Sequence, residues 1–327
     1  MTKLKNQFLE VSDALALGNP AIPEKDYWVV ALLAQLATLA FDTHQMVFSG
    51  GTALAKSHVR IFRMSEDVDI KLIPTAVFHS FSRDKRKEKR KALLKEIEDL
   101  LTLQSSHFSI EKKIVRDEYR YVEYQLKYPQ QFSQAPCLRP IIKLELIETI
   151  PLLQVEQRSI QSLVAQLYHQ SQEVGKFACV TVQSTLVEKV ISMLRRTMLV
   201  KRDPKRKDDP TLVRHIYDIY CINIDQQLDY EVLIPLFRIV LQEDVKRFGK
   251  QHLDFALNPI QELQLGLAEL EFNPLYYQRF IDFVTPMVFT TETPNFDTCF
   301  ASFKRIAQSL MVNNEKRVPT KFPQSSS

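Results

Sequence analysis

The 327-residue sequence is poor in residues that cross-link or interrupt a chain, with only four cysteines, six glycines and one tryptophan. The cysteines, Cys137, Cys179, Cys221 and Cys299, lie far apart and form no Cys-x-x-Cys pair. This spacing indicates neither a zinc site nor a disulfide framework. We therefore expect the cysteines to be small buried hydrophobic residues.

Long apolar runs are also missing. No uninterrupted apolar segment reaches the roughly 18 residues that a membrane helix needs, and the first residues of the chain lack the apolar centre of a signal peptide. We therefore expect a cytoplasmic protein that has no membrane partner.

The composition is otherwise that of a globular protein, with 45% hydrophobic and 25% charged residues, and the length favours two domains. The net charge of +4 is mild, but basic residues concentrate at 83–91 and 201–207. Such runs are usually solvated helix ends or loops, and they indicate a nucleic-acid partner only if other features point to phosphate.

Hydrophobic periodicity predicts a mixed sheet with helices in the first half of the chain. The first part is expected to contain a helix that begins at Pro23, a strand, a glycine turn, a short helix and a half-buried strand. These segments are residues 23–41, 45–49, 50–51, 52–62 and 66–72.

A basic helix is expected to follow, with its apolar stripe at residues 93–101. Three strands are then predicted at 107–115, 119–128 and 139–148. After residue 182 the pattern becomes helical, with helices predicted at 185–198, 210–222, 230–241, 260–270 and 296–311. The predicted fold class is therefore α/β (α+β): a mixed sheet packed against a helical C-terminal domain.

Two carboxylates carry the first chemical signal. Asp67 and Asp69 are two residues apart on a predicted strand, so both side chains project from one face, where their repulsion favours a cation between them. Hard oxygen ligands suit magnesium. A solvated polar strand face is the alternative, and it is the more common reason for an isolated Asp-x-Asp pair.

The glycine pair changes this balance. Gly50 and Gly51 lie between a strand and a helix, where backbone N–H groups can receive phosphate oxygens. Glu145, on a strand of the same predicted sheet, is a candidate third carboxylate for two-metal phosphoryl or nucleotidyl transfer, and its alternative is a solvent-facing residue of an edge strand.

Charged residues of the helical half supply further candidates. Lys189 and Arg196 lie two turns apart on one face of a predicted helix, where they could bind a triphosphate or simply face solvent. Arg214 and Asp218 form an i, i+4 pair on the next helix, which is also typical of a surface ion pair. His215 has no partners that indicate a zinc ligand.

Taken together, these segments resemble the AbiEii/AbiGii-type nucleotidyltransferase toxins. The pattern Gly-Gly-Thr-Ala-Leu followed by Arg-x-Ser-x-Asp-x-Asp-Leu is matched at 50–54 and 63–70, with Ile70 in place of the leucine. Segments 141–148, 186–196 and 214–220 are similar to later motifs of the family. His215 stands where an aspartate is usual, and the resemblance covers roughly residues 45–225.

The resemblance implies a nucleotidyltransferase core of the polymerase-β type at 1–182. It also implies a helical domain at 183–315 that contributes to the active-site cleft, followed by a flexible tail at 316–327. The implied catalytic residues are Asp67, Asp69, Glu145, Lys189 and Asp218, of which the first three would hold Mg²⁺. The implied NTP- or phosphate-binding residues are Gly50, Gly51, Thr52, Arg63, Ser65, Lys143, Arg196 and Arg214.

The implied activity is transfer of a nucleoside monophosphate from an NTP to RNA, with the 3′ end of tRNA as the first acceptor to consider, in a toxin–antitoxin or phage-defence system. The basic runs would then contact RNA. Two alternatives stay open: transfer of NMP or phosphate to a protein hydroxyl, and a non-catalytic interaction protein that retains the fold.

The resemblance also implies an antitoxin partner, either a transcriptional repressor or a kinase. Ser65 lies two residues before Asp67, so a phosphate on Ser65 would repel NTP and compete for metal. Ser65 is therefore a candidate for regulatory phosphorylation, whereas the preferred base and the oligomeric state are open.

Overall fold

The computed structural model describes residues 2–103, 107–134, 138–150, 155–290 and 292–315. The chain divides into two compact units. Unit 1 comprises residues 1–185 and 286–293, and unit 2 comprises residues 186–285 and 294–327. The tail predicted at 316–327 and Cys137 lie outside the described residues, whereas Cys179, Cys221 and Cys299 are buried thiols, as predicted.

Unit 1 contains a mixed seven-stranded sheet among its described residues, with the strand order β3-β4-β5-β2-β1-β7-β6. The β2–β5 and β1–β7 pairs are parallel, and the other neighbouring pairs are antiparallel. This arrangement confirms the predicted fold class. The strands are β1 (His44–Ser49), β2 (Asp67–Pro74), β3 (Ser109–Arg116), β4 (Tyr121–Lys127), β5 (Ile142–Glu148), β6 (Glu156–Ile160) and β7 (Val174–Cys179).

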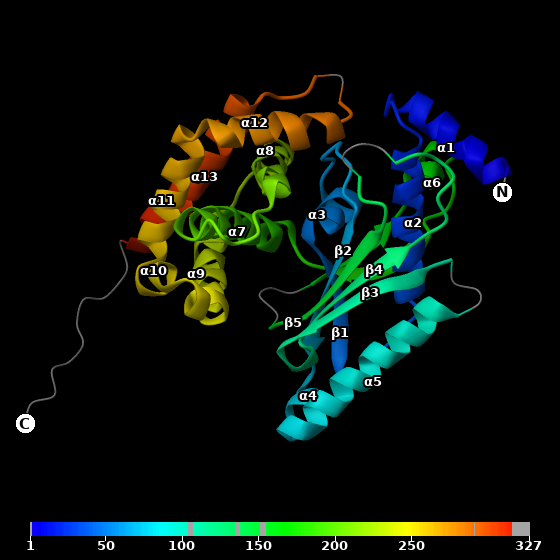
Figure 1. The fold of residues 1–327 in the computed structure, drawn as a ribbon, viewed down its shortest axis with the longest axis horizontal. Coiled ribbons are helices and arrows are strands. Elements are labelled where there is room, and N and C mark those ends of the chain that lie inside the picture. The colour runs from blue at the N-terminus through cyan, green and yellow to red at the C-terminus, as the bar shows by residue number, and fades with distance from the viewer. Residues whose placement is uncertain (1, 104–106, 135–137, 151–154, 291, 316–327) are drawn as a thin grey trace, which may run out of the picture. The chain divides into compact units, whose positions relative to one another are not determined.

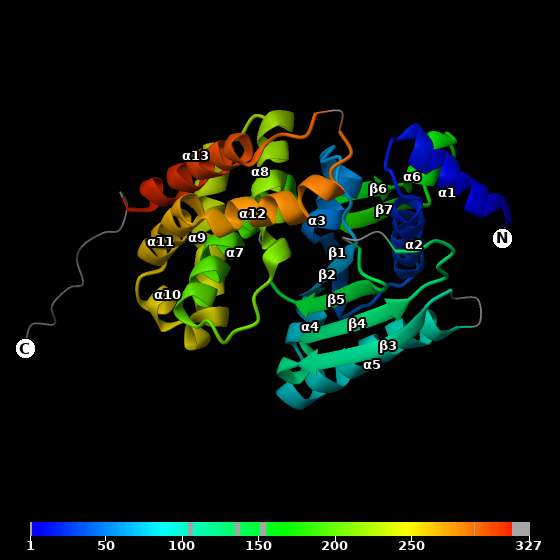
Figure 2. The ribbon, with the colours of Figure 1, turned by 45° about the horizontal axis from the view of Figure 1, so that its top comes forward.

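Two helices, α2 (Ala21–Leu36) and α5 (Arg83–Thr102), cover one face of this sheet (Figures 1 and 2). Their apolar stripes pack on alternate strand residues, for example Ile97 of α5 and Leu144 of β5, which are completely buried. The alternation leaves polar residues of β2, β4 and β5 on the opposite face.

A smaller core lies beside this one, where α1 (Thr2–Ala14) and α6 (Leu163–Leu167) pack near the start of α2. Phe8, Val11, Met64 and Met287 are buried in it. Helix α1 was not among the predicted elements. Short helical segments α4 (Ala76–His79) and η2 (Asp117–Tyr119) complete the connections.

Several predicted helix boundaries were wrong, including the end of α2, which is at Leu36 rather than at residue 41. Helix α2 begins at Ala21 rather than Pro23, because a proline inside the first turn removes an N–H that has no helical partner there. The helix after the glycine pair comprises α3 (Gly50–Ala53) and the π-turn η1 (Leu54–His58), and it ends at His58 rather than at Phe62. The chain is extended at Val59, and the side chains of Val59 and Ile61 are both buried beyond the end of the helix.

Unit 2 is helical. Its described helices include the five predicted from periodicity and the shorter α10 and α12. Helices α7 and α11 pack closely at Gly266, because a Cβ added to Gly266 would lie only 2.6 Å from the carbonyl oxygen of Leu194. The helices are α7 (Val182–Arg202, whose first residues belong to unit 1), η3 (Pro210–Val213), α8 (Arg214–Asp225), α9 (Tyr230–Phe248), η4 (Gly249–Gln251), α10 (Leu253–Leu257), α11 (Pro259–Phe272), α12 (Pro274–Phe283) and α13 (Phe296–Glu315). None of the helices in the described part of the chain combines the length and the apolar character required to cross a bilayer.

Candidate functional site

The polar face of the sheet in unit 1 brings three of the predicted carboxylates together. Asp67 and Asp69 project from the same face of β2, while Val68 and Ile70 enter the core. Strand β5 runs parallel to β2 in a register that places Glu145 beside Asp69. The three side chains are half-buried and belong to neighbouring positions of two adjacent strands.

A fourth carboxylate, Glu123 of β4, extends this row, because Glu123 pairs with Glu145 in the β4–β5 register. The hydroxyl of Tyr121 donates to Glu123 Oε2 at 3.0 Å and to Glu145 Oε1 at 3.3 Å. The amide of Gln125 donates to Glu123 Oε1 at 2.9 Å. The sequence prediction missed Glu123 and Tyr121. The alternation of polar and apolar residues along β4 indicates that Tyr121 and Glu123 share one face of the strand. It does not reveal that this face adjoins Glu145, because that depends on the pairing of β4 with β5.

Two cations balance this negative face. Arg139 donates to Asp67 Oδ1. Lys143 Nζ lies 2.7 Å from Glu145 Oε1 and 3.7 Å from Asp67 Oδ2. Burial acts to lower the pKa of Lys143, but the negative charges of Asp67, Glu145 and Asp69 outweigh burial and hold the pKa above its ordinary value. Lys143 is therefore an ammonium ion bound to the carboxylates.

Gly50 lies directly against one of these carboxylates. Its φ of +79° is in the left-handed region that favours glycine, and a Cβ at this position would lie 2.0 Å from Asp69 Oδ2. Ser49 Oγ also donates to the backbone oxygen of Asp69 at 3.0 Å. The strand–turn–helix segment is therefore built around Asp69, which gives Gly50 a second reason to be glycine besides a phosphate-facing turn.

The other predicted phosphate-binding residues of unit 1 connect the glycine turn to β2. Thr52 Oγ1 donates to the backbone oxygen of Asp67 at 2.5 Å and lies 2.9 Å from Ser65 Oγ. Arg63 is buried, and its guanidinium donates to the carbonyl oxygen of Met64 at 2.8 Å. These contacts hold the segment that precedes Asp67.

Buried charged residues near the start of α2 hold the segment that precedes Asp67. The sequence prediction also missed these residues. Lys25 donates to Glu66 and, at 2.6 Å, to the carbonyl oxygen of Arg139. Glu66 accepts the N–H of Arg139 at 2.9 Å. Burial lowers the pKa of Lys25, although Glu66 opposes this shift. One buried ion pair thus holds both the residue before Asp67 and the backbone of Arg139.

The charge of this face fits a divalent cation. The carboxylates of Asp67, Asp69 and Glu145 offer the hard oxygen donors that magnesium prefers. In the structure, Arg139 and Lys143 supply positive charge to Asp67 and Glu145, which favours the ionised form of both carboxylates. Within the described ranges, however, no three Asp, Glu, His or Cys side chains are already arranged as a metal site.

Unit 2 contains the remaining predicted residues. Lys189 Nζ on α7 lies 2.8 Å from Asp218 Oδ2 on α8, and both side chains are buried, at 7% and 0% exposure. Arg196 Nη2 lies 2.9 Å from Asp209 Oδ2. Arg214 Nε donates to the carbonyl oxygen of Phe283 at 3.4 Å. The structure therefore pairs Lys189 with Asp218, whereas Arg196 binds a different aspartate.

Comparison with known families supports a nucleotidyltransferase. The family model described as "Nucleotidyl transferase AbiEii toxin, Type IV TA system" matches residues 31–302. This range includes the carboxylate face of unit 1 and the Lys189–Asp218 pair of unit 2.

A solved structure has a similar fold. It is MenT4, a nucleotidyltransferase toxin from Mycobacterium tuberculosis H37Rv, with a TM-score of 0.57 and 16% sequence identity, and the match covers 96% of this chain and 90% of that chain. No curated protein sequence matches the chain.

Proposed function

The chain belongs to the AbiEii family of nucleotidyltransferase toxins of type IV toxin–antitoxin systems, and from this premise we propose that it transfers NMP from an NTP to RNA. The 3′ end of tRNA is the proposed acceptor, and Mg²⁺ is the proposed cofactor. The observation that carries the proposal is the register of β2 and β5, which places Asp69 beside Glu145 with Asp67 on the same face.

In this proposal the carboxylates of Asp67, Asp69 and Glu145 hold the cofactor. Magnesium, when bound, supplies positive charge to the triphosphate and to the attacking hydroxyl. The chain's own part is positional: Gly50 leaves room for the Asp69 carboxylate, and Tyr121 holds Glu145 by a hydrogen bond.

Residues of unit 2 complete the proposed machinery. Lys189 neutralises charge on the leaving pyrophosphate, and Asp218 holds the ammonium group in position at 2.8 Å. Arg196 and Arg214 are the proposed phosphate ligands, as are Gly51, Thr52, Arg63 and Lys143 of unit 1. The proposed protein partner is a cognate antitoxin.

Ser65 is the proposed point of control. Its hydroxyl lies 2.9 Å from Thr52 Oγ1, and the backbone oxygen of Asp67 binds the same threonine. A phosphate on Ser65 would break this contact and place negative charge beside the carboxylates. We expect Ser65→Asp to lose transfer and Ser65→Ala to retain part of it, and equal transfer by wild type and Ser65→Asp would refute this control.

The transfer reaction is tested with Mg²⁺, each labelled NTP in turn and total tRNA. We expect label on RNA with the wild type and a loss of at least about 100-fold with Asp69→Asn, because that change removes a charge from the proposed metal site. Glu96→Gln, which changes an exposed carboxylate on α5, is the matched control and should transfer label normally. Label on protein rather than RNA would select the protein-hydroxyl alternative, and equal transfer by Asp69→Asn would rule out the proposed site.

A further inference from the structure

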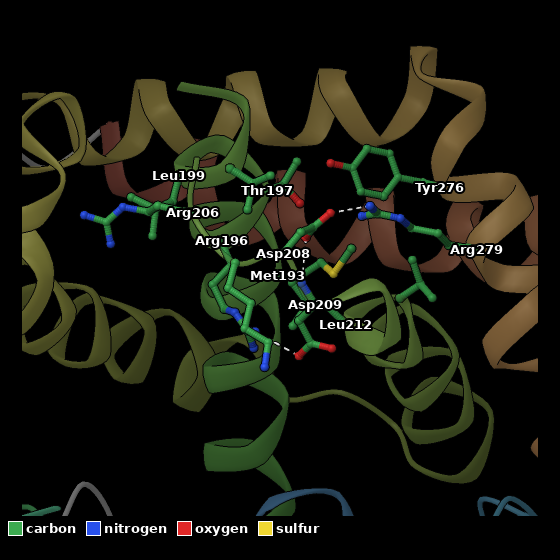
Figure 3. A pocket seen from close by; sticks show the side chains of 13 residues that line it. Met193, Arg196, Thr197, Leu199, Arg206, Asp208, Asp209, Leu212, Tyr276 and Arg279 are labelled. Carbon is green, nitrogen blue, oxygen red and sulfur yellow. Dashed lines mark hydrogen bonds and ion pairs between the residues drawn. The ribbon is translucent and has the colours of Figure 1, made fainter. Parts of the chain in front are cut away.

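A cavity within unit 2 is lined by residues that, apart from Arg196, have no part in the proposed reaction. It encloses about 260 Å³ between α7, the segment 206–213 and α12 (Figure 3). The segment includes the end of the second basic run, so the structure gives part of this run a defined place. Four cations and two acids line the cavity: Arg196, Arg206, Lys207, Arg279, Asp208 and Asp209.

The two aspartates are already bound to cations of the lining. Asp209 Oδ2 lies 2.9 Å from Arg196 Nη2, and its Oδ1 accepts hydrogen bonds from the backbone N–H and the hydroxyl of Thr211. Asp208 binds Arg279 and accepts the N–H of Asp209 at 2.7 Å. Figure 3 shows both ion pairs as dashed lines. The aspartates therefore hold the two arginines in place.

Because Arg196 and Arg279 neutralise the two aspartates, the positive charges of Arg206 and Lys207 are in excess within the lining. Burial acts to raise the pKa of Asp209, but Thr211 and Arg196 outweigh burial and lower it, so Asp209 stays ionised. Arg206 lies 3.4 Å from Asp203, which is half exposed, and also donates to Gln251. Lys207 is exposed at the cavity. Four positive and two negative side chains thus leave a surplus of positive charge.

A buried hydroxyl adds an observation of a different kind. Thr197 of α7 lines the cavity and is 3% exposed, and its hydroxyl interacts with the hydroxyl of Tyr276, where it opposes the rise that burial causes in the pKa of Tyr276. Figure 3 shows the hydroxyl directed to the same side as the hydroxyl of Tyr276. Two hydroxyls therefore lie side by side in the lining, and both can bind a ligand oxygen in the cavity.

We propose that this cavity binds a phosphate group of a nucleotide or of an RNA chain. Guanidinium groups offer planar pairs of N–H donors that match phosphate oxygens, and arginines already fixed by aspartates lose little entropy when they bind. The volume is slightly below the ~300 Å³ at which pockets for drug-sized ligands begin, which suits a phosphate with part of its sugar rather than a whole NTP. Of the residues assigned to NTP in the proposed reaction, only Arg196 lines this cavity.

The proposal concerns equilibrium binding, so it can be tested independently of catalysis. The experiment uses the full-length Asp69→Asn protein, so that no turnover occurs, and titrates it with pyrophosphate, AMP and a short RNA oligonucleotide at several salt concentrations. The test variant is Arg206→Gln/Lys207→Ala. The matched control is Lys246→Ala, which removes an exposed cation of α9 that lies outside both basic runs and does not line the cavity.

We expect the double variant to weaken binding at least about tenfold and to reduce the slope of log affinity against log salt by about 2, one for each cation removed. Lys246→Ala should leave both unchanged. Loss of RNA binding alone identifies an RNA phosphate, and parallel loss of AMP or pyrophosphate binding identifies a free nucleotide or phosphate. Unchanged binding of all three probes by the double variant would overturn the proposal.

A second pair of variants tests the buried hydroxyl. Thr197→Val keeps the shape of the side chain and removes the hydroxyl beside Tyr276, so it should lower phosphate affinity, with the urea midpoint reporting the structural cost separately, whereas Thr197→Ser should retain the affinity. If Thr197→Val binds all three probes as tightly as the parent protein, the hydroxyl has no part in the cavity's function and the proposed site is wrong in this respect.

Discussion

At the scale of single residues, the tightest constraint in the candidate site is the contact between Gly50 and Asp69. Gly50 combines a positive φ with a carboxylate oxygen only 2.0 Å from the position of a Cβ. A side chain there would be strained by its backbone and would also have to displace Asp69. Since Asp69 is a proposed metal ligand, the steric contact connects a turn residue directly to the proposed chemistry.

We therefore predict that Gly50→Ala reduces NMP transfer by at least about 100-fold, because a shift of about 1 Å in a reacting group can cost that much. The measurement is the initial rate of label transfer to tRNA, together with the urea midpoint. A rate within about threefold of wild type would mean that Asp69 can move without loss of function.

Gly18 provides the matched control, since its φ is +70° but a Cβ there would meet nothing within 4 Å. Gly18→Ala should lose about 1 kcal/mol of stability from backbone strain and keep its transfer activity. Comparison of the two variants separates the cost of the φ angle from the displacement of Asp69.

At the scale of elements, strand β5 holds proposed site residues near its start and a buried ion pair at its end. Lys143 and Glu145 point to the carboxylate face, while Glu148 accepts two hydrogen bonds from Arg90 of α5, at 2.5 and 2.8 Å. His44 of β1 also lies 3.2 Å from Glu148. Glu148 thus ties the helix on one face of the sheet to two of its strands.

This buried contact predicts a loss of stability in acid. Burial acts to raise the pKa of Glu148, but hydrogen bonds from His44 and Arg90 outweigh burial and lower the pKa to about 2. Because the pKa is lower in the folded state, the contribution is complete above about pH 4.5 and is lost as the pH falls toward 2. It amounts to about 3 kcal/mol at neutral pH.

The test measures urea unfolding of wild type and Glu148→Gln between pH 3 and pH 7. We expect the difference in unfolding free energy to be largest at pH 7 and to shrink at pH 3. Asp99→Asn on α5, which removes an exposed i, i+4 pair with Lys95, should change stability by less than about 0.5 kcal/mol at either pH. A Glu148→Gln difference that does not vary with pH would show that the carboxylate is not ionised in this contact.

Elements were predictable from the sequence where their periodicity is strong. The alternation of Ile142, Leu144 and Leu146 with Lys143 and Glu145 correctly indicated which side chains of β5 enter the core. Helix α1 was missed, and the helix after Gly51 was predicted too long, because propensity alone does not reveal that Val59 and Ile61 are buried outside a helix.

Contacts between distant segments were not predictable in the same way. Glu123 joins the carboxylate row only because β4 pairs with β5, and strand order is a tertiary property. Arg139 donates to Asp67, and its backbone is held by hydrogen bonds to Lys25 and Glu66. Lys25 and Arg139 are more than a hundred positions apart in the sequence. Local patterns do not encode such partners, whereas the i, i+2 geometry of Asp67 and Asp69 follows from the strand itself.

At the scale of the whole molecule, the proposed catalytic residues are divided between the two units. The carboxylates belong to unit 1, and the Lys189–Asp218 pair belongs to unit 2. A buried ion pair is weak evidence for either stability or function, because its desolvation opposes its attraction. The pair could serve the fold of unit 2 alone, and this alternative makes a different prediction for variants.

Removal of one partner should destabilise the protein under either interpretation. Lys189→Met removes the ammonium group that lies 2.8 Å from the buried Asp218 carboxylate, so we expect a loss of about 3–5 kcal/mol in unfolding free energy. Lys189→Met/Asp218→Asn removes both charges and keeps similar shapes, so stability should return to within about 1.5 kcal/mol of wild type.

The double variant separates the two roles, because it folds without the ammonium group. If Lys189 neutralises charge on the leaving pyrophosphate, the double variant should still transfer at least about 100-fold more slowly than wild type at saturating NTP and tRNA. If the pair serves only the fold of unit 2, transfer should return together with stability. Measurement of the urea midpoint and the transfer rate on the same preparation decides between them, and recovery of both would remove Lys189 and Asp218 from the proposed machinery.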